Sequence, residues 1–213
     1  MVFFVFDRID AKEAHFKKTF LLHVNGEDAP VISGNTVTVT NGGGKLVNTS
    51  LLGGDEIVPL GGKDAAGNRQ NFLINGVQCN DPDGSNNEWG RVEISPAVGS
   101  KSDLLLNVLY VTDKTQTKTL TPVHIASDNS LLQGASVAGI TAMFGTDREK
   151  ITAPCSFTVS GSDTMTYYIG GLAAGTWDVM LDGRKITSVS VSAEESLISF
   201  RAGCGTVSIT RVQ

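Results

Sequence analysis

The most constraining feature of this chain is a hydrophobic period of two that recurs along most of its length. Thr36 to Thr40 alternates threonine with valine, Asn41-Gly42 follows, and Gly44 to Leu52 returns as a second β-forming segment. Alternation of this kind is typical of a strand with one buried face. Asn-Gly favours the tight turn that joins two antiparallel strands. The segment therefore predicts a β-hairpin, and the same pattern elsewhere predicts an all-β chain.

Further segments are predicted to be strands: Val2 to Ile9, Thr19 to Val24, Gly90 to Ser95 and Thr117 to Ala126. Leu104 to Val111 is a nearly continuous apolar run, which is typical of a strand covered on both faces. From Cys155 onward, apolar segments recur about every ten residues, as expected of a sandwich. We predict an antiparallel two-sheet β-sandwich over residues 1–145 and a smaller β module over residues 146–213. The polar stretch from Gly145 to Pro154 marks that boundary.

One short segment favours a helix instead of a strand. Asp10 followed by Glu13 fits a capping box, and Ala11 to Lys18 contains good helix formers. Because β-rich segments flank it, we expect about two helical turns that join the first two strands.

Charge and hydropathy exclude two classes of partner. The net charge is −5 and no run of basic residues occurs, which argues against a nucleic-acid partner. The apolar start, Met1 to Phe6, is too short for a signal peptide or a membrane span, and Asp7 interrupts it. We therefore expect no membrane insertion and no signal peptide in this chain.

The residues that usually hold metals do not occur in a metal-binding pattern. The three cysteines form no CxxC motif, and no Cys/His spacing suggests zinc. The segment Asn80 to Glu88 is rich in oxygen ligands, but Gly84 comes too early after Asp81 for a calcium loop. We expect no metal and no cofactor.

Several groups of residues occur in a fixed order: Val5-Phe6-Asp7-Arg8-Ile9 with Lys18 to His23, then Gly44 to Leu52, then Trp89 to Pro96 with Asp103 to Leu109, then Gly171-Leu172 with Gly175-Thr176-Trp177 and Asp182-Gly183. Together they resemble the carboxy-terminal region of the heparinase II/III-like polysaccharide lyases over nearly the whole chain. The resemblance implies a β-sandwich region of a secreted or periplasmic protein that acts on uronate-containing glycans such as glycosaminoglycans.

The resemblance also implies that the catalytic part lies outside this chain. In that family an α/α toroid supplies catalytic Tyr and His side chains, and earlier strands of the β region carry zinc ligands. His15, His23 and His124 do not lie in such a context, so we carry over no catalytic residue and no metal ligand.

The chemistry of the lyase reaction agrees with this reading. β-Elimination on a uronate needs a base, an acid for the leaving oxygen and a group that neutralises the carboxylate. Tyr110 lies in an apolar run, and Tyr167 and Tyr168 point to opposite faces of a strand with no nearby His in the sequence. A catalytic Tyr/His pair is therefore not expected.

Three residues are candidates for binding a sugar. Trp89 and Arg91 lie two apart and share one face of a strand, where they could hold an acidic sugar by stacking and a bidentate carboxylate bond. The alternative is a packing pair, with Glu93 simply neutralising Arg91. His23 ends an apolar strand and either faces a sugar-binding cleft or is a hydrogen-bonded histidine at a strand end.

The sequence thus favours an accessory β region of a polysaccharide lyase that is inactive alone and contacts an acidic polysaccharide. We expect the apolar strand that starts at Val2 to form an exposed sheet edge that docks an α/α toroid catalytic domain or a second copy of the chain. Two alternatives remain, a free-standing carbohydrate-binding module and a purely structural β domain.

Overall fold

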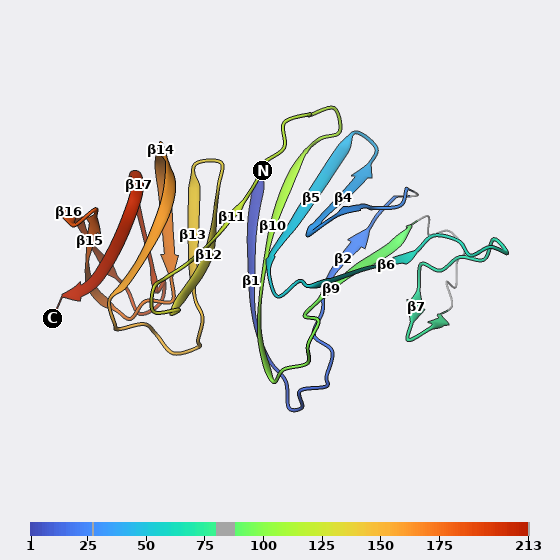
Figure 1. The fold of residues 1–213 in the computed structure, drawn as a ribbon, viewed down its shortest axis with the longest axis horizontal. Helices are drawn as coiled ribbons and strands as arrows, with labels where there is room; N and C mark the ends of the chain where they lie inside the picture. Colours follow the sequence, from blue (N-terminus) through green and yellow to red (C-terminus); the bar gives the residue numbers. More distant parts are fainter. Residues whose placement is uncertain (27, 80–87, 213) are drawn as a thin grey trace. The chain divides into compact units, whose positions relative to one another are not determined.

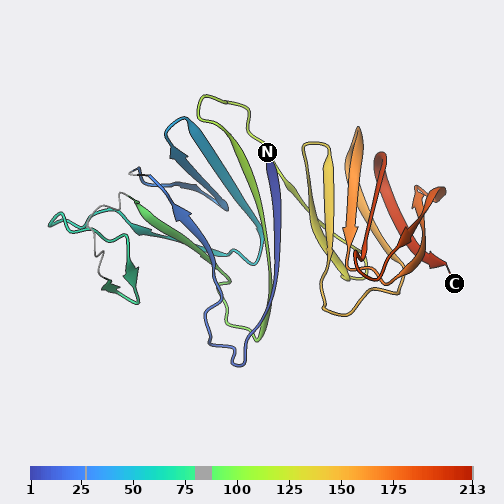
Figure 2. The same cartoon turned by 180° about the vertical axis from the view of Figure 1, so that it is seen from behind.

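The computed structural model describes residues 1–26, 28–79 and 88–212, so most of the Asn80 to Glu88 segment considered for calcium lies outside the described residues. The chain divides into two compact units, Met1–Thr119 (unit 1) and Leu120–Gln213 (unit 2). The regular elements of the described residues are all β-strands, which confirms the all-β prediction (Figures 1 and 2). No helix long and apolar enough to cross a membrane occurs in these ranges.

Unit 1 contains a five-stranded antiparallel sheet. Its strand order is β1 (Val2–Asp10), β10 (Ser102–Asp113), β5 (Gly44–Leu52), β4 (Thr36–Asn41) and β3 (Val31–Ser33). The predicted hairpin is present, because Asn41 pairs with Gly44 and Gly42 takes a φ of 55° in the turn. β1 lies at one end of the strand order and pairs with β10.

A three-stranded antiparallel sheet forms the second layer of unit 1. It consists of β2 (Phe20–Val24), β9 (Gly90–Ser95) and β6 (Glu56–Gly61), with β9 in the centre. Alternate residues of both sheets bury a shared core: Leu22, Val24, Val37, Val39, Val92 and Ile94. This arrangement confirms the predicted two-sheet sandwich, and Figure 1 shows its two layers.

The chain leaves this sandwich between β6 and β9. Here β7 (Leu73–Ile74) and β8 (Val77–Gln78) form a small hairpin. Its turn residues Asn75 and Gly76 have φ angles of 49° and 80°. Positive φ at both positions matches the turn expected from an Asn-Gly pair.

Unit 2 is one seven-stranded sheet. Its strand order is β11 (Val123–Ala126), β12 (Leu132–Val137), β13 (Ile140–Gly145), β14 (Cys155–Gly170), β17 (Leu197–Val212), β15 (Gly175–Leu181) and β16 (Arg184–Val191). β13 and β14 are parallel, and the other neighbours are antiparallel. One core cluster includes both Ile125 of β11 and Val191 of β16, so the sheet curves around its own apolar face. Trp177, Tyr167 and Phe157 are the largest fully buried side chains in that core.

The units divide at a different place from the boundary expected near residue 145. The predicted strands do not include residues 132–145, yet β12 and β13 lie there. They join unit 2 because residues 140–143 pair with residues 166–169 of β14. The turn between β12 and β13 uses Ala138 and Gly139 with φ angles of 52° and 79°. Alanine at such a position carries no turn signal, which explains why this hairpin was missed. Because the division lies between residues 119 and 120, the second, smaller unit contains more of the chain than the predicted module over residues 146–213.

The predicted helix over Ala11 to Lys18 is wrong. The segment forms bends and turns without helical hydrogen bonding, and residues 12–17 are exposed. An isolated helix of two turns is unstable without an apolar face to pack. Contacts with the sandwich hold the segment instead, since the amide of Ala11 bonds the carbonyl of Lys101 at 2.7 Å and Lys18 pairs with Asp103 at 2.9 Å.

Candidate functional site

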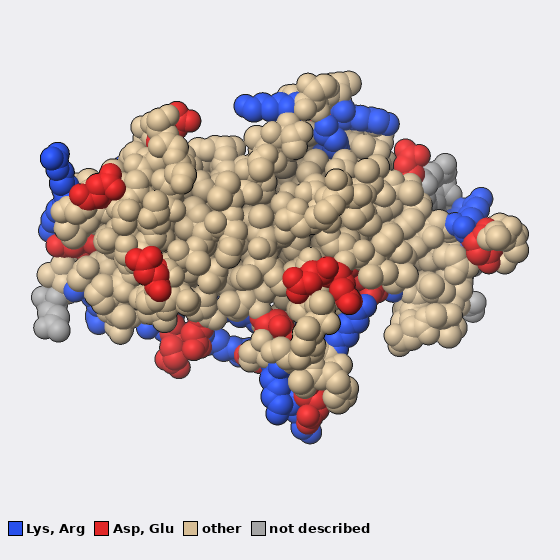
Figure 3. Space-filling view, in the orientation of Figure 1, with Lys and Arg blue, Asp and Glu red and all other residues tan. Residues whose placement is uncertain are grey.

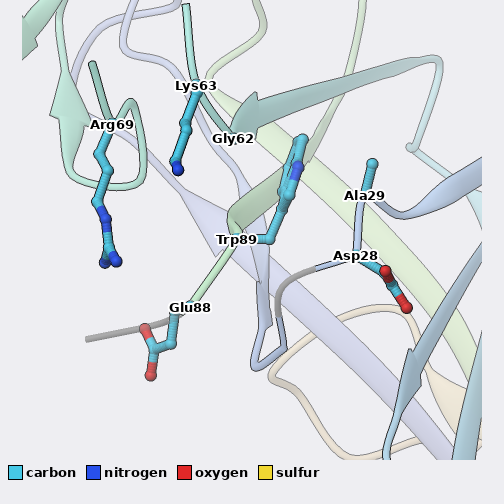
Figure 4. A pocket seen from close by; sticks show the side chains of 7 residues that line it. All are labelled: Asp28, Ala29, Gly62, Lys63, Arg69, Glu88 and Trp89. Atoms are coloured by element: carbon cyan, nitrogen blue, oxygen red, sulfur yellow. The ribbon is translucent and has the colours of Figure 1, made fainter. Parts of the chain in front are cut away.

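A cleft of about 490 Å³ opens in unit 1 where the chain re-enters the sandwich at β9. An aromatic ring, two cations and two carboxylates line it: Trp89, Lys63, Arg69, Asp28 and Glu88, with Gly62 and Ala29 completing the wall. Figure 4 shows Lys63 and Arg69 on one side of the Trp89 indole and Asp28 on the other. The cleft combines a flat apolar surface with groups that bind anions and hydroxyls.

Trp89 is fixed by contact with glycines. A Cβ on Gly61 would lie 2.7 Å from Cε3 of the indole, and a Cβ on Gly62 would lie 3.0 Å from its Nε1. The amide of Gly62 donates a 2.7 Å hydrogen bond to the Trp89 carbonyl. Both rings of the indole therefore lie against two successive residues without side chains, and the half-buried ring has a defined orientation.

Lys63 and Arg69 are placed by a tight excursion that follows β6. The two residues form an antiparallel bridge, so their side chains leave the backbone on the same side. The carboxylate of Asp64 closes the excursion by accepting hydrogen bonds from the amides of Ala66 and Asn68 at 2.9 and 2.8 Å. Hydrogen bonds from the side chain and backbone of Asn68 lower the pKa of Asp64.

The charges that line the cleft cancel formally, with two cations facing two carboxylates. Lys63 and Asp28 are exposed, whereas Arg69 and Glu88 are half-buried. On the face drawn in Figure 3, acidic and basic side chains are interspersed. The electrostatic selectivity of the cleft is therefore set by the positions of its individual charged side chains and not by a broad surface potential of one sign.

Arg91 lies beside the cleft residues in sequence but takes part in a different network. Its Nε donates to Glu93 at 2.9 Å, and its Nη2 donates to the carbonyl of Leu73 at 2.6 Å. Lys17 contacts the second carboxylate oxygen of Glu93 at 2.5 Å. With only 13% of its side chain exposed, Arg91 links β9 to the β7–β8 hairpin. The expected neutralisation by Glu93 is observed, and Arg91 does not line the cleft.

His23 is the register partner of Arg91 across β2 and β9. Its side chain is exposed and it is not among the residues that line the cleft. The structure thus brings His23 and Arg91 together on the outer face of the three-stranded sheet, and it places Trp89 in the cleft with Lys63 and Arg69. Sequence reasoning missed Lys63 and Arg69, although Gly61-Gly62 before them marks a close backbone approach.

Tyr167, whose pKa is strongly raised, packs in the core of unit 2. The hydroxyl of Tyr167 donates to the carbonyl of Gly203 at 2.8 Å, and its ring stacks on Phe200 with 4.9 Å between centroids. Burial, together with the nearby Cys204 and Asp182, raises its pKa to about 12. Tyr168 is 42% exposed on the opposite face, as predicted. A phenol with so high a pKa is a poor base near neutral pH.

The histidines and possible metal ligands are also accounted for. Nε2 of His124 lies 2.7 Å from Oε1 of Gln133, and the ring of His15 contacts Phe16 edge-on. Within residues 1–26, 28–79 and 88–212, no group of three or more His, Cys, Asp or Glu side chains is arranged to hold a metal ion.

A comparison with protein families agrees with the resemblance in the second part of the chain. Residues 126–211 match the family model of the heparinase II C-terminal domain. The match begins within β11 and ends within β17, so it covers nearly all of unit 2. A search of curated proteins finds no match to the chain.

Proposed function

We propose that this chain, whose residues 126–211 match the heparinase II C-terminal domain, is an accessory β region of a polysaccharide lyase that does not catalyse β-elimination by itself. The family match to unit 2 is the observation that carries the proposal. It supports association with a catalytic domain and with a polysaccharide substrate.

The chemistry of the described side chains supports the absence of catalysis. Elimination from a uronate needs a base at the C5 proton and an acid at the leaving oxygen. The Tyr167 hydroxyl is bonded to a backbone carbonyl, and the His124 ring contacts an amide side chain. These structural contacts of Tyr167 and His124 support the proposal that the catalytic pair comes from another domain.

The match to the heparinase II C-terminal domain supports a proposal for the polysaccharide and for its location. We propose that the polysaccharide is an acidic, uronate-containing glycan such as a glycosaminoglycan. We also propose that the chain contacts it outside the cytoplasm, as part of a secreted or periplasmic protein. The mixture of a Trp ring, two cations and two carboxylates in the cleft of unit 1 fits such a ligand.

The edge strand β1 is the proposed docking element in unit 1. It pairs with β10 on one side, and Met1 and Phe3 are 77% and 47% exposed. Strand addition to such an edge satisfies backbone groups and covers apolar side chains. An α/α toroid domain or a second copy supplies the partner. Light scattering at several concentrations separates these, because self-association appears as a concentration-dependent dimer and docking of a toroid leaves a monomer.

The second candidate function is a free-standing carbohydrate-binding module. The Trp89 cleft is the observation that favours it, because an aromatic ring beside polar groups is a common way to bind sugars. This function predicts glycan binding that is complete without any catalytic partner.

An ultraviolet absorbance assay for unsaturated uronate product tests the proposal. The purified chain is incubated with heparin, heparan sulfate, hyaluronan, chondroitin and alginate, and a known lyase serves as the positive control. We expect no product from this chain. Product that increases with chain concentration, and that persists after removal of trace contaminants, would contradict the proposal.

A further inference from the structure

We propose that the Trp89 cleft of unit 1 binds one anionic pyranose unit, with the sugar ring stacked on Trp89 and its carboxylate or sulfate held by Lys63 and Arg69. The inference deepens the proposed function, since it assigns the polysaccharide contact to particular residues. The cleft lies in unit 1, whereas the family match covers residues 126–211 of unit 2.

The indole offers a prearranged stacking surface. Gly61 and Gly62 press against its two rings, and the Trp89 carbonyl is bonded to the Gly62 amide. Gly90 allows the next close approach, because a Cβ there would lie 2.2 Å from the Leu60 carbonyl oxygen. A ring whose orientation is fixed before binding loses little conformational entropy when a sugar stacks on it.

The two cations of the cleft lie next to each other. Lys63 and Arg69 are direct partners in an antiparallel bridge, so their Cα atoms lie about 5 Å apart. Figure 4 shows both side chains extending in the same direction beside the indole. A planar carboxylate suits the guanidinium fork of Arg69, with Lys63 as a point charge beside it.

The carboxylates of Glu88 and Asp28 complete the recognition. Both line the cleft, and carboxylates accept hydrogen bonds from sugar hydroxyls. They also repel a ligand whose every edge is anionic. The cleft therefore selects a sugar that carries one anionic group and several hydroxyls, rather than any polyanion.

Arg91 has a different part in this site. Through the Leu73 carbonyl and Glu93 it ties the β7–β8 hairpin to β9. The hairpin belongs to the same excursion between β6 and β9 that carries Lys63 and Arg69. Arg91 is thus a positioning residue and does not contact the sugar.

Intrinsic fluorescence provides a direct measurement of binding. The chain has two tryptophans, and Trp177 is fully buried in unit 2, so the Trp177→Phe variant leaves Trp89 as the only indole. A hyaluronan tetrasaccharide, whose only anion is a carboxylate, is titrated into this variant. We expect a saturable change in Trp89 emission, and about tenfold weaker affinity after Lys63→Gln or Arg69→Gln. Lys12→Gln, at an exposed lysine in the segment between β1 and β2, is the matched control and should bind unchanged.

Further ligands separate the sources of the anion. A sulfated keratan oligosaccharide carries sulfate without carboxylate, and chitotetraose carries neither. Binding of either anionic ligand that weakens in the Lys63 and Arg69 variants supports the proposal and identifies its anion. Equal binding of chitotetraose, binding that the two substitutions leave unchanged, or no binding of any ligand would overturn it. The proposed accessory function is tested separately by the lyase assay and would survive these outcomes.

Discussion

The Gly62 amide donates a 2.7 Å hydrogen bond to the Trp89 carbonyl, and a Cβ added at Gly62 would lie 3.0 Å from Nε1 of the Trp89 indole. These contacts couple the end of β6 to the start of β9, although the 62–89 excursion separates them in sequence. The cleft therefore depends on small residues as much as on its charged ones.

Replacing Gly61 by alanine should both destabilise unit 1 and displace Trp89. A Cβ at Gly61 would lie 2.1 Å from the Trp89 carbonyl oxygen, so the backbone has to move. We expect a loss of roughly 1–3 kcal/mol in the free energy of unfolding, measured by urea denaturation. Gly43→Ala is the control, since a Cβ there meets nothing within 4 Å. Equal stability of the two variants would show that Trp89 is not held in this way.

Removing the Arg91 side chain should loosen the β7–β8 hairpin. Arg91→Ala deletes the 2.6 Å hydrogen bond to the Leu73 carbonyl and leaves Glu93 with Lys17 alone. We expect faster amide hydrogen exchange over residues 73–78 and weaker sugar binding without a change in the anion preferred. Arg184→Ala, at an exposed arginine of unit 2, should leave exchange in this hairpin unchanged. Unaltered amide hydrogen exchange over residues 73–78 in Arg91→Ala would contradict the proposal that Arg91 positions the hairpin.

The contribution of Glu93 to stability should depend on pH in a defined direction. Burial raises the pKa of Glu93, but hydrogen bonds and charges from Lys17 and Arg91 lower it by more in total, so the net pKa is below its ordinary value. A carboxyl with a lowered folded-state pKa stabilises the fold above its unfolded-state pKa, and that stabilisation is lost as the pH falls through the folded-state value.

Thermal unfolding of the wild type and Glu93→Gln at several pH values checks this direction. The wild type should be more stable at pH 6–7, and the difference should shrink below about pH 4. A difference that grows with acidity would contradict the assignment. Asp55→Asn, at an exposed carboxylate outside this network, provides the comparison.

The buried Asn48–Asn107 pair should behave as a coupled unit. Both side chains are fully buried, and Asn48 Nδ2 donates to Asn107 Oδ1 at 3.1 Å. Either single alanine substitution leaves a buried polar partner unsatisfied, which costs roughly 1–3 kcal/mol. The double substitution should cost less than the sum of the two singles. Strict additivity in urea denaturation would show that the pair is not coupled.

The sequence predicts the fold of unit 1 well because its strands alternate and its turns carry Asn-Gly. It predicts the division of the chain poorly because the β12–β13 hairpin turns at Ala138-Gly139 and β13 pairs in parallel with β14. Parallel pairing joins segments that are distant in sequence, and no local residue pattern records it. The helix predicted at residues 11–18 fails for the opposite reason, since local propensity is overridden by tertiary contacts of Ala11 and Lys18.

The site shows the same limit. Trp89 was predicted as a sugar contact and lies in the cleft, but its expected partner Arg91 turns to Glu93 and Leu73. Lys63 and Arg69 reach the cleft from the excursion that follows β6. The course of that excursion depends on the Asp64 turn and on the close approaches at Gly61, Gly62 and Gly90. Spacing along one strand identifies residues on a common face, whereas a cleft built by a return of the chain appears only in three dimensions.

The most direct test of the whole account is an amide NMR titration of the full chain with the hyaluronan tetrasaccharide, in which the proton spectrum of the sugar is followed at the same time. We predict saturable shifts at the amides of Gly62, Lys63, Arg69 and Trp89 and at the Trp89 indole, with the sugar chemically unchanged at the end. Shifts that fall only in unit 2 would contradict the proposal that the Trp89 cleft binds the sugar. A vinylic proton signal from unsaturated uronate would contradict the claim that the chain binds without catalysing elimination.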